Sequence, residues 1–181
     1  MLGCLAPLVL LAVLAGPSDV TVALRDGRGS CGVHGSFAVP VSRTAAWQVL
    51  TDYDSLGRFV RSIEASHLER HPDGRLLVRQ SAVGGAFLFR RHVRVLLELE
   101  LDPGRRIGFR DVLGKDFQRY VGEWRLSADS SATRVEYQLE ADPRGLVART
   151  FCRGPLRIAA QELLTQVRDE MIRRAERESA R

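Results

Sequence analysis

Two aspartates, Asp52 and Asp54, come closest in this chain to a pair of catalytic carboxylates. Such a pair can serve as general acid and general base when a substrate lies between the two groups. The same residues follow a stretch, 43–51, whose apolar spacing predicts a helix with Ser42 as its N-cap. Because Asp commonly caps the free backbone groups at helix ends, we interpret both aspartates as caps and not as an acid–base pair.

Residue types that bind metals or act as nucleophiles are present without the spacing that their chemistry needs. The four histidines, His34, His67, His71 and His92, are scattered along the chain and form no metal-ligand pattern. The chain contains no G-x-S-x-G motif, phosphate-binding loop or dinucleotide fingerprint. The sequence therefore predicts no metal site, no cofactor and no catalytic residue.

Two polar residues lie on otherwise apolar sides of expected strands. Arg91 shares its side with Phe89 and Val93. Inside a cavity its guanidinium could bind a ligand carboxylate or phosphate, whereas a β-bulge would turn it toward water. Gln80 shares its side with Val78, and its amide could orient a ligand carbonyl or satisfy a neighbouring backbone group. Both alternatives stay open for each residue.

Stretches with strand-like alternation must position these residues. The longest spans 87–101, where apolar side chains share one side and polar ones the other. This pattern is typical of an antiparallel sheet that is covered on one face only. Together with further alternating stretches it predicts a sheet of about six or seven strands, and the weaker alternation at 19–25 is a candidate for a short first strand. The further stretches are 33–39, 63–70, 76–82, 107–109, 117–126 and 135–141.

Residues 152–181 read as one long amphipathic helix, which we expect from about 151 to 178. Apolar residues recur at the three- and four-residue spacing of one helix face. They are Leu156, Ala160, Leu163, Val167 and Met171, with Ile158, Leu164, Ile172 and Ala175 widening the stripe. So long a stripe needs a broad partner surface. The simplest architecture is therefore an α+β fold in which a curved antiparallel sheet grips one C-terminal helix.

Composition predicts one globular domain and argues against a nucleic-acid partner. The chain has 181 residues, of which 45% are hydrophobic, and a formal net charge of +5. Among its 27 basic residues only Lys115 is a lysine, and the arginines of the last helix are interleaved with acids. No basic stripe or recognition motif results, so we expect no nucleic-acid binding.

The N-terminal stretch 1–15 is almost wholly apolar but short for a membrane-spanning helix, and Gly16, Pro17 and Ser18 follow it. This pattern predicts a secretory signal over 1–18, with an uncleaved membrane anchor as the alternative. We therefore expect an exported or membrane-anchored domain spanning 19–181. The domain would be cytoplasmic if the first residues are no true signal, and the oligomeric state is left open.

Two cysteines, Cys31 and Cys152, remain after such a segment is removed. In an exported chain they could form a disulfide, since one begins the first long strand and the other precedes the last helix. The alternative is that both are small buried hydrophobic residues.

Residues 47–60, WQVLTDYDSLGRFV, are similar to the signature of the polyketide cyclase and coenzyme Q-binding START-like family. Further matches are at 77–80, Gly122, Trp124, Leu126 and 133–137. The resemblance covers roughly 33–174 and departs from the family pattern at Arg61, where a proline is common. It implies the helix-grip fold of the START-like (SRPBCC) superfamily, a fold that hosts unrelated chemistries.

A helix-grip fold implies a space between the concave sheet and the helix, and ligand sites are usually apolar cavities with few polar groups. Inward-facing residues of the expected elements then form the candidate ligand site. These residues are Phe59, Val78, Gln80, Phe89, Arg91, Trp124, Tyr137, Leu163 and Val167.

Two functions fit such a site. The first is non-catalytic binding of a hydrophobic small molecule: a lipid, a quinone or a polyketide-like compound. The alternative is a cyclase or dehydratase acting on a polyketide-like substrate in the same cavity. Because an enzyme needs titratable groups that converge inside its cavity, and few inward positions carry any, the sequence favours binding.

Overall fold

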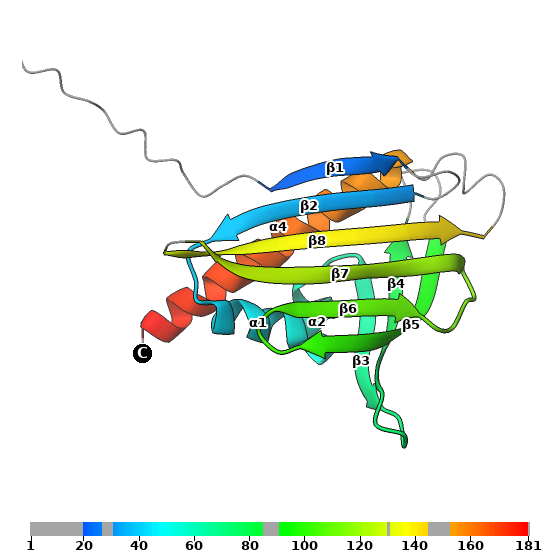
Figure 1. Cartoon of the computed structure of the whole chain (residues 1–181), viewed down its shortest axis with the longest axis horizontal. Helices are drawn as coiled ribbons and strands as arrows, with labels where there is room; N and C mark the ends of the chain where they lie inside the picture. Colours follow the sequence, from blue (N-terminus) through cyan, green and yellow to red (C-terminus); the bar gives the residue numbers. More distant parts are fainter. Residues whose placement is uncertain (1–19, 27–30, 85–90, 130, 145–152, 181) are drawn as a thin grey trace, which may run out of the picture.

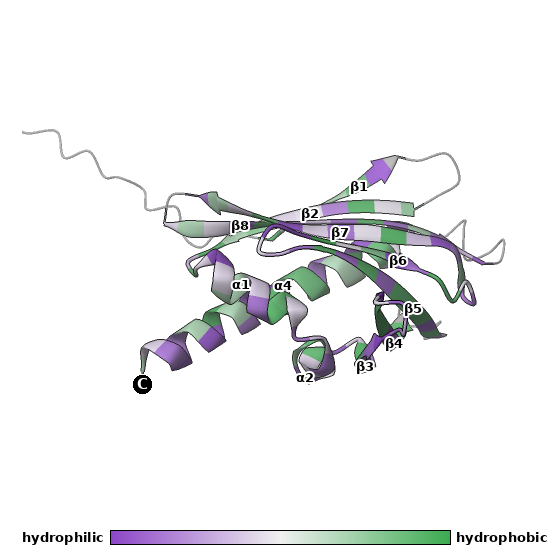
Figure 2. Cartoon of the chain, turned by 60° about the horizontal axis from the view of Figure 1, so that its bottom comes forward, coloured by the Kyte–Doolittle hydropathy of each residue, from purple (hydrophilic) through white to green (hydrophobic). Residues whose placement is uncertain are grey.

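The computed structural model describes residues 20–26, 31–84, 91–129, 131–144 and 153–180. Its elements form two layers, which are one antiparallel sheet and a set of helices on the sheet's concave side (Figures 1 and 2). The long C-terminal helix runs behind the sheet in Figure 1 and below it in Figure 2. The predicted architecture, a curved antiparallel sheet around one C-terminal helix, is therefore confirmed.

The sheet contains eight strands in the order β1-β2-β8-β7-β6-β5-β4-β3, and every neighbouring pair is antiparallel. The strands are β1 Thr21–Asp26, β2 Cys31–Val39, β3 Ile63–Arg70, β4 Leu76–Gly84, β5 Arg91–Asp102, β6 Arg106–Asp111, β7 Phe117–Asp129 and β8 Ala132–Pro143. The expectation of six or seven strands was too low. The additional strand is β1, whose apolar alternation is weak. It nevertheless pairs with β2 along its whole length, from Thr21 opposite Ser36 to Asp26 opposite Cys31.

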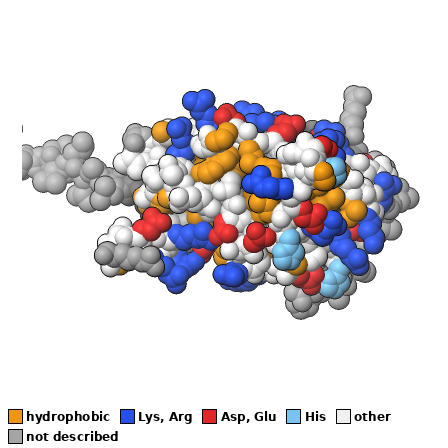
Figure 3. Space-filling view, turned by 90° about the horizontal axis from the view of Figure 1, so that it is seen from below, with side chains coloured by type: hydrophobic (Ala, Val, Ile, Leu, Met, Phe, Trp, Pro, Cys, Tyr) orange, Lys and Arg blue, Asp and Glu red, His pale blue; other side chains and the backbone are white. Residues whose placement is uncertain are grey.

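The two faces of the sheet differ as the alternation predicts. Side chains such as Val33, Phe37 and Val135 are buried on the concave side. Polar side chains of the sheet form ion pairs instead, among them Arg106 of β6 with Glu123 of β7 at 2.8 Å. On the side of the molecule that is seen from below in Figure 3, arginines are mixed with acids, and hydrophobic side chains lie between them.

Three short helical segments, α1 (Arg43–Thr51), η1 (Tyr53–Ser55) and α2 (Leu56–Phe59), connect β2 to β3. Ser42 caps α1 as predicted, because its hydroxyl accepts a hydrogen bond from the Ala45 amide at 3.1 Å. Buried residues of α1, such as Val49 and Leu50, face the space beneath the sheet.

The long helix α4 (Arg153–Ser179) agrees with the expected bounds to within two residues. Its buried apolar residues are Ala160, Leu164, Val167 and Met171, all from the predicted stripe. Ile158 was wrongly assigned to that stripe, since its side chain is 59% exposed. It lies two residues from Ala160, which puts it on the opposite side of the helix.

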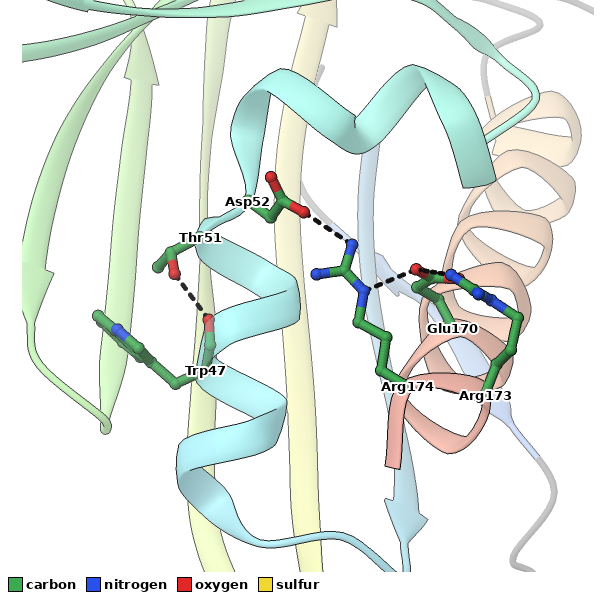
Figure 4. A network of polar contacts seen from close by, with 6 residues as sticks. All are labelled: Trp47, Thr51, Asp52, Glu170, Arg173 and Arg174. Carbon is green, nitrogen blue, oxygen red and sulfur yellow. Dashed lines mark hydrogen bonds and ion pairs between the residues drawn. The ribbon is translucent and has the colours of Figure 1, made fainter. Parts of the chain in front are cut away.

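A polar network fastens α1 to α4 (Figure 4). The Arg174 guanidinium donates to Asp52 at 2.7 Å and to Glu170 at 2.7 Å, and Arg173 also donates to Glu170 at 2.7 Å. Glu170 is only 5% exposed, so its two arginines keep a buried carboxylate paired. The network fixes the end of α1 against the helix that closes the cavity.

The interpretation as helix caps holds for the position of Asp52, which is the C-cap of α1 and the N-cap of η1, although its side chain makes no capping hydrogen bond. It was wrong for Asp54, which lies inside η1, while Ser55 is the N-cap of α2. Asp52 binds Arg174, and Asp54 accepts a hydrogen bond from the Leu68 amide at 3.1 Å. Both carboxylates therefore connect the α1–η1 junction to other elements, Asp52 to α4 and Asp54 to β3. Neither lines the cavity described below.

Glu170→Gln should lower the free energy of unfolding by about 1.5–3 kcal/mol at neutral pH, the usual contribution of hydrogen bonds to charged groups. Burial acts to raise the pKa of Glu170, but the arginines outweigh it, and the pKa lies below the ordinary 4.5. A carboxylate whose pKa is lower in the folded state stabilises the protein at pH values above its ordinary pKa. This stabilisation is lost as the pH falls through the folded-state pKa. The difference between variant and wild type should therefore shrink below pH 4.5.

Urea melts at several pH values measure this effect, with Glu162→Gln as the control. Glu162 is exposed on the same helix, so its change should stay within about 0.5 kcal/mol. A loss in Glu170→Gln that is the same at every pH would contradict the assigned role of the carboxylate.

Cys31 is disulfide-bonded, while Cys4 and Cys152 lie outside the described residues. The Cys31–Cys152 bridge therefore stays a prediction. A chain that lacks 1–18 should contain no free thiol and should migrate differently on reducing and non-reducing gels. Equal mobility together with two free thiols would contradict the bridge.

The predicted signal at 1–18 also lies outside the described residues. Among the helices of the described ranges, none combines the length and the apolar character needed to span a bilayer.

Candidate ligand-binding cavity

A cavity of about 260 Å³ lies between the concave side of the sheet and the helices α1 and α4. One part of its wall is aliphatic. Strands β4 and β5 contribute Val78, Val95 and Leu97, and α4 contributes Leu163 and Val167. These side chains belong to the hydrophobic core or pack against it, so the aliphatic wall is part of the fold itself.

The other part of the wall is aromatic and comes from β6, β7 and β8. The ring centroids of Trp124 and Tyr137, which are opposite each other across β7 and β8, are 4.4 Å apart. Phe109 lies 6.1 Å from Tyr120 and 6.3 Å from Tyr137, and Phe117 lies 4.7 Å from Tyr120. All five rings line the cavity, so one side of a bound molecule would meet a continuous aromatic surface.

Gly122 makes this aromatic wall possible. It is opposite Phe109 in the β6–β7 ladder and Leu139 in the β7–β8 ladder. A Cβ atom at this position would lie 2.5 Å from Cζ of Phe109, so the ring occupies the space that a side chain would fill. The missing side chain therefore lets Phe109 lie across the strand between Tyr120 and Tyr137.

Two phenols form one polar part of the cavity wall. The pKa of Tyr120 is raised to about 12, chiefly by burial. A hydrogen bond with Tyr137 lowers this pKa in part, and the negative charge of Asp111 raises it further. Burial also raises the pKa of Tyr137 well above 10, and Tyr120 reinforces that shift. Both phenols therefore stay protonated at neutral pH and can donate hydrogen bonds, but they cannot act as bases.

Three further polar residues, Gln80, Tyr53 and Ser62, line the cavity. The Gln80 amide donates to the Ser66 hydroxyl at 3.2 Å, so the neighbouring strand β3 holds its side chain. The Tyr53 hydroxyl is buried and has no hydrogen-bond partner among the described residues. None of the described lining residues is charged.

The structure places most of the predicted site residues in this wall. Those that line the cavity are Val78, Gln80, Trp124, Tyr137, Leu163 and Val167. Their ability to bind a ligand remains a prediction. Within the described ranges, no cluster of three or more His, Cys, Asp or Glu side chains could hold a metal ion.

Phe59 is a correction, because it does not line the cavity. It ends the single turn of α2, and its ring centroid lies 5.7 Å from the guanidinium carbon of Arg174. This cation–π contact adds Phe59 to the network between the short helices and α4.

Two predicted residues cannot be assigned to the wall. Phe89 lies outside the described residues. Arg91 begins β5 opposite Gly84, but its side chain is not among those described. Its alternative roles, binding a ligand anion or facing water, therefore both stay open.

Sequence reasoning missed the contribution of the region between β2 and β3. Val49, Leu50, Tyr53 and Leu56 all line the cavity. The apolar spacing of 45–50 indicated that α1 has a packing face, which is a signal for Val49 and Leu50. Tyr53 follows the helix and belongs to no periodic pattern, so its position depends on the tertiary fold.

The arrangement of one curved sheet, one long helix and an apolar cavity between them defines a helix-grip protein. A sequence model of the family described as "Polyketide cyclase / dehydrase and lipid transport" matches residues 30–176. The chain therefore belongs to that family, and the predicted membership of the START-like superfamily is confirmed. No curated protein matches the sequence.

Solved structures with low sequence identity share the fold. The Zhui aromatase/cyclase from Streptomyces sp. R1128 has a TM-score of 0.70 and 18% identity, with 81% of this chain and 96% of that chain covered. The STAR-related lipid transfer protein from Xanthomonas axonopodis has a TM-score of 0.68 and 18% identity, with coverages of 84% and 93%. A START superfamily protein from Mycobacterium smegmatis has a TM-score of 0.67 and 12% identity, with coverages of 78% and 97%.

Proposed function

We propose that this protein binds a hydrophobic small molecule, such as a lipid, a quinone or a polyketide-like compound, in the cavity, and that it does so without catalysis. The observation that carries this proposal is the described part of the cavity wall, whose side chains are apolar except for neutral hydroxyl, amide and indole groups. A wall of this kind favours burial of apolar ligand surface, at roughly 25 cal/mol per Å². The lipid transport named in the family description supports the same reading.

The alternative is a cyclase or dehydratase acting on a polyketide-like substrate in the same cavity. The family description and the Zhui aromatase/cyclase support it. Among the described lining residues, however, no carboxylate, imidazole or amine is available as a general base. The raised pKa values of Tyr120 and Tyr137 keep these phenols protonated, so neither can act as a general base. Binding is therefore the better-supported function.

Titration with the neutral fluorescent probe N-phenyl-1-naphthylamine tests the proposal. We expect saturable binding of one probe per folded chain, competition by a quinone or a fatty acid ester, and loss of binding when the protein is unfolded. Absence of saturable binding would contradict the proposed function. Turnover of a polyketide-like substrate that Tyr120→Phe abolishes would favour the enzyme instead.

We also propose that residues 1–18 direct export or anchor the chain in a membrane, leaving 19–181 as the ligand-binding domain. The apolar stretch 1–15 and the small residues after it support this assignment. Fractionation of cells that express the full chain, or a chain beginning at 19, tests it. We expect to recover the full chain outside the cell or in the membrane fraction, and the chain beginning at 19 in the cytoplasm. Recovery of both chains in the cytoplasm would contradict the assignment.

A further inference from the structure

We propose that Tyr53 recognises the polar end of the ligand and that this ligand carries a neutral hydroxyl or carbonyl group. The inference rests on the proposed function, because it assigns a substrate class and a specificity-determining residue to the same cavity. Its starting point is the hydroxyl of Tyr53, which is buried without a hydrogen-bond partner among the described residues.

Tyr53 is held in the wall of the cavity. It begins η1, is only 8% exposed, and lines the cavity together with Leu50 and Leu56. Both flanking residues are fixed to other elements, Asp52 by Arg174 of α4 and Asp54 by the Leu68 amide of β3. The backbone on either side of Tyr53 is therefore tied down, and the phenol is positioned in advance of ligand binding.

Three of the other polar residues in the wall already have hydrogen-bond partners. Tyr120 and Tyr137 interact with each other, and the Gln80 amide donates to Ser66. The Tyr53 hydroxyl has no such partner within the described ranges, although buried polar groups in native proteins are nearly always paired. A ligand atom that reached this hydroxyl would supply the missing hydrogen bond.

The chemistry of the wall restricts what that ligand atom can be. No described lining residue carries a positive charge that could neutralise a carboxylate or phosphate in the cavity. A phenol that stays protonated can donate to a carbonyl or hydroxyl oxygen and can accept from a hydroxyl. The ligand that fits best is therefore an apolar molecule with one neutral hydroxyl or carbonyl group.

Two fluorescent probes that differ by one hydroxyl, 2-naphthol and naphthalene, test this inference when titrated into wild type and Tyr53→Phe. The quantity compared is the Kd of naphthalene divided by the Kd of 2-naphthol. This ratio should fall about tenfold in Tyr53→Phe, because only 2-naphthol loses a hydrogen bond, and naphthalene should bind both proteins equally. Thermal melts of Tyr53→Phe should show an unchanged or raised Tm, since no internal hydrogen bond is removed.

Each other outcome overturns the inference. An unchanged ratio would show that Tyr53 does not recognise the hydroxyl, and a ratio that falls in Tyr137→Phe instead would assign this role to the other phenols. A lower Tm of Tyr53→Phe would reveal a structural partner for its hydroxyl. If the wild type binds both probes in these cases, the proposed function stands and only the role of Tyr53 is contradicted. If the wild type binds neither probe, the proposed function and the role of Tyr53 are both contradicted.

Discussion

Gly122→Ala should destabilise the protein by about 3 kcal/mol, the upper end of the usual cost of overpacking a core. The added Cβ atom would lie 2.5 Å from Cζ of Phe109 and would also collide with the backbone oxygen of Gln138. The Phe109 ring can move only toward the cavity or its aromatic neighbours, and the carbonyl belongs to the adjacent strand β8. Neither obstacle can shift without disturbing the aromatic wall.

Gly154→Ala is the matched control, because a Cβ atom at Gly154 would meet nothing within 4 Å. This residue lies in the first turn of α4, where alanine should be neutral or should stabilise by up to about 1 kcal/mol. Denaturant melts of both variants measure the difference. Equal stability of the two variants would mean that Phe109 does not occupy the space above Gly122.

Val167→Trp should reduce uptake of N-phenyl-1-naphthylamine at least tenfold while the protein still folds. Val167 is buried on α4 and lines the cavity. An indole at this position would extend into a cavity of about 260 Å³ and take up space that the probe needs. Part of the overpacking cost is avoided because the ring enters an existing space.

Ile158→Trp is the control for this prediction, since Ile158 is exposed on the same helix and does not line the cavity. Its probe affinity should equal that of the wild type. Circular dichroism and melts of both variants confirm folding, and Leu163→Trp offers a second cavity-filling change if Val167→Trp is too unstable. Undiminished uptake by folded cavity-filling variants would exclude the cavity as the binding site.

The sequence was sufficient to predict the layers of the fold and much of the cavity wall. Successive side chains of a strand point to opposite faces of the sheet, so the alternation of apolar and polar residues alone assigns each side chain to a face. This places Val78, Trp124 and Tyr137 on the inward face. A helical period does the same for Leu163 and Val167. These residues face the cavity because their own elements orient them.

Contacts between distant elements could not be predicted in this way. Glu170 has the polar character of an exposed helix residue, yet it is buried because Arg173 and Arg174 pair with it beside α1. Asp52 occupies a helix-cap position, as predicted, but the partner of its side chain is Arg174, which is 122 residues away in the chain. Periodicity within one segment holds no information about such pairs. For the same reason the sequence did not predict that Phe59 contacts Arg174 and does not line the cavity.

Mass spectrometry of organic extracts tests the central claim, that the cavity holds a hydrophobic ligand, most directly. The protein is purified from cells in parallel with Val167→Trp and Ile158→Trp, and equal amounts are extracted. We expect one class of neutral, apolar compound in near-equimolar amount from wild type and Ile158→Trp, and a large loss of it from Val167→Trp. The same compounds at equal levels in all three extracts, or no apolar compound in any of them, would contradict the claim.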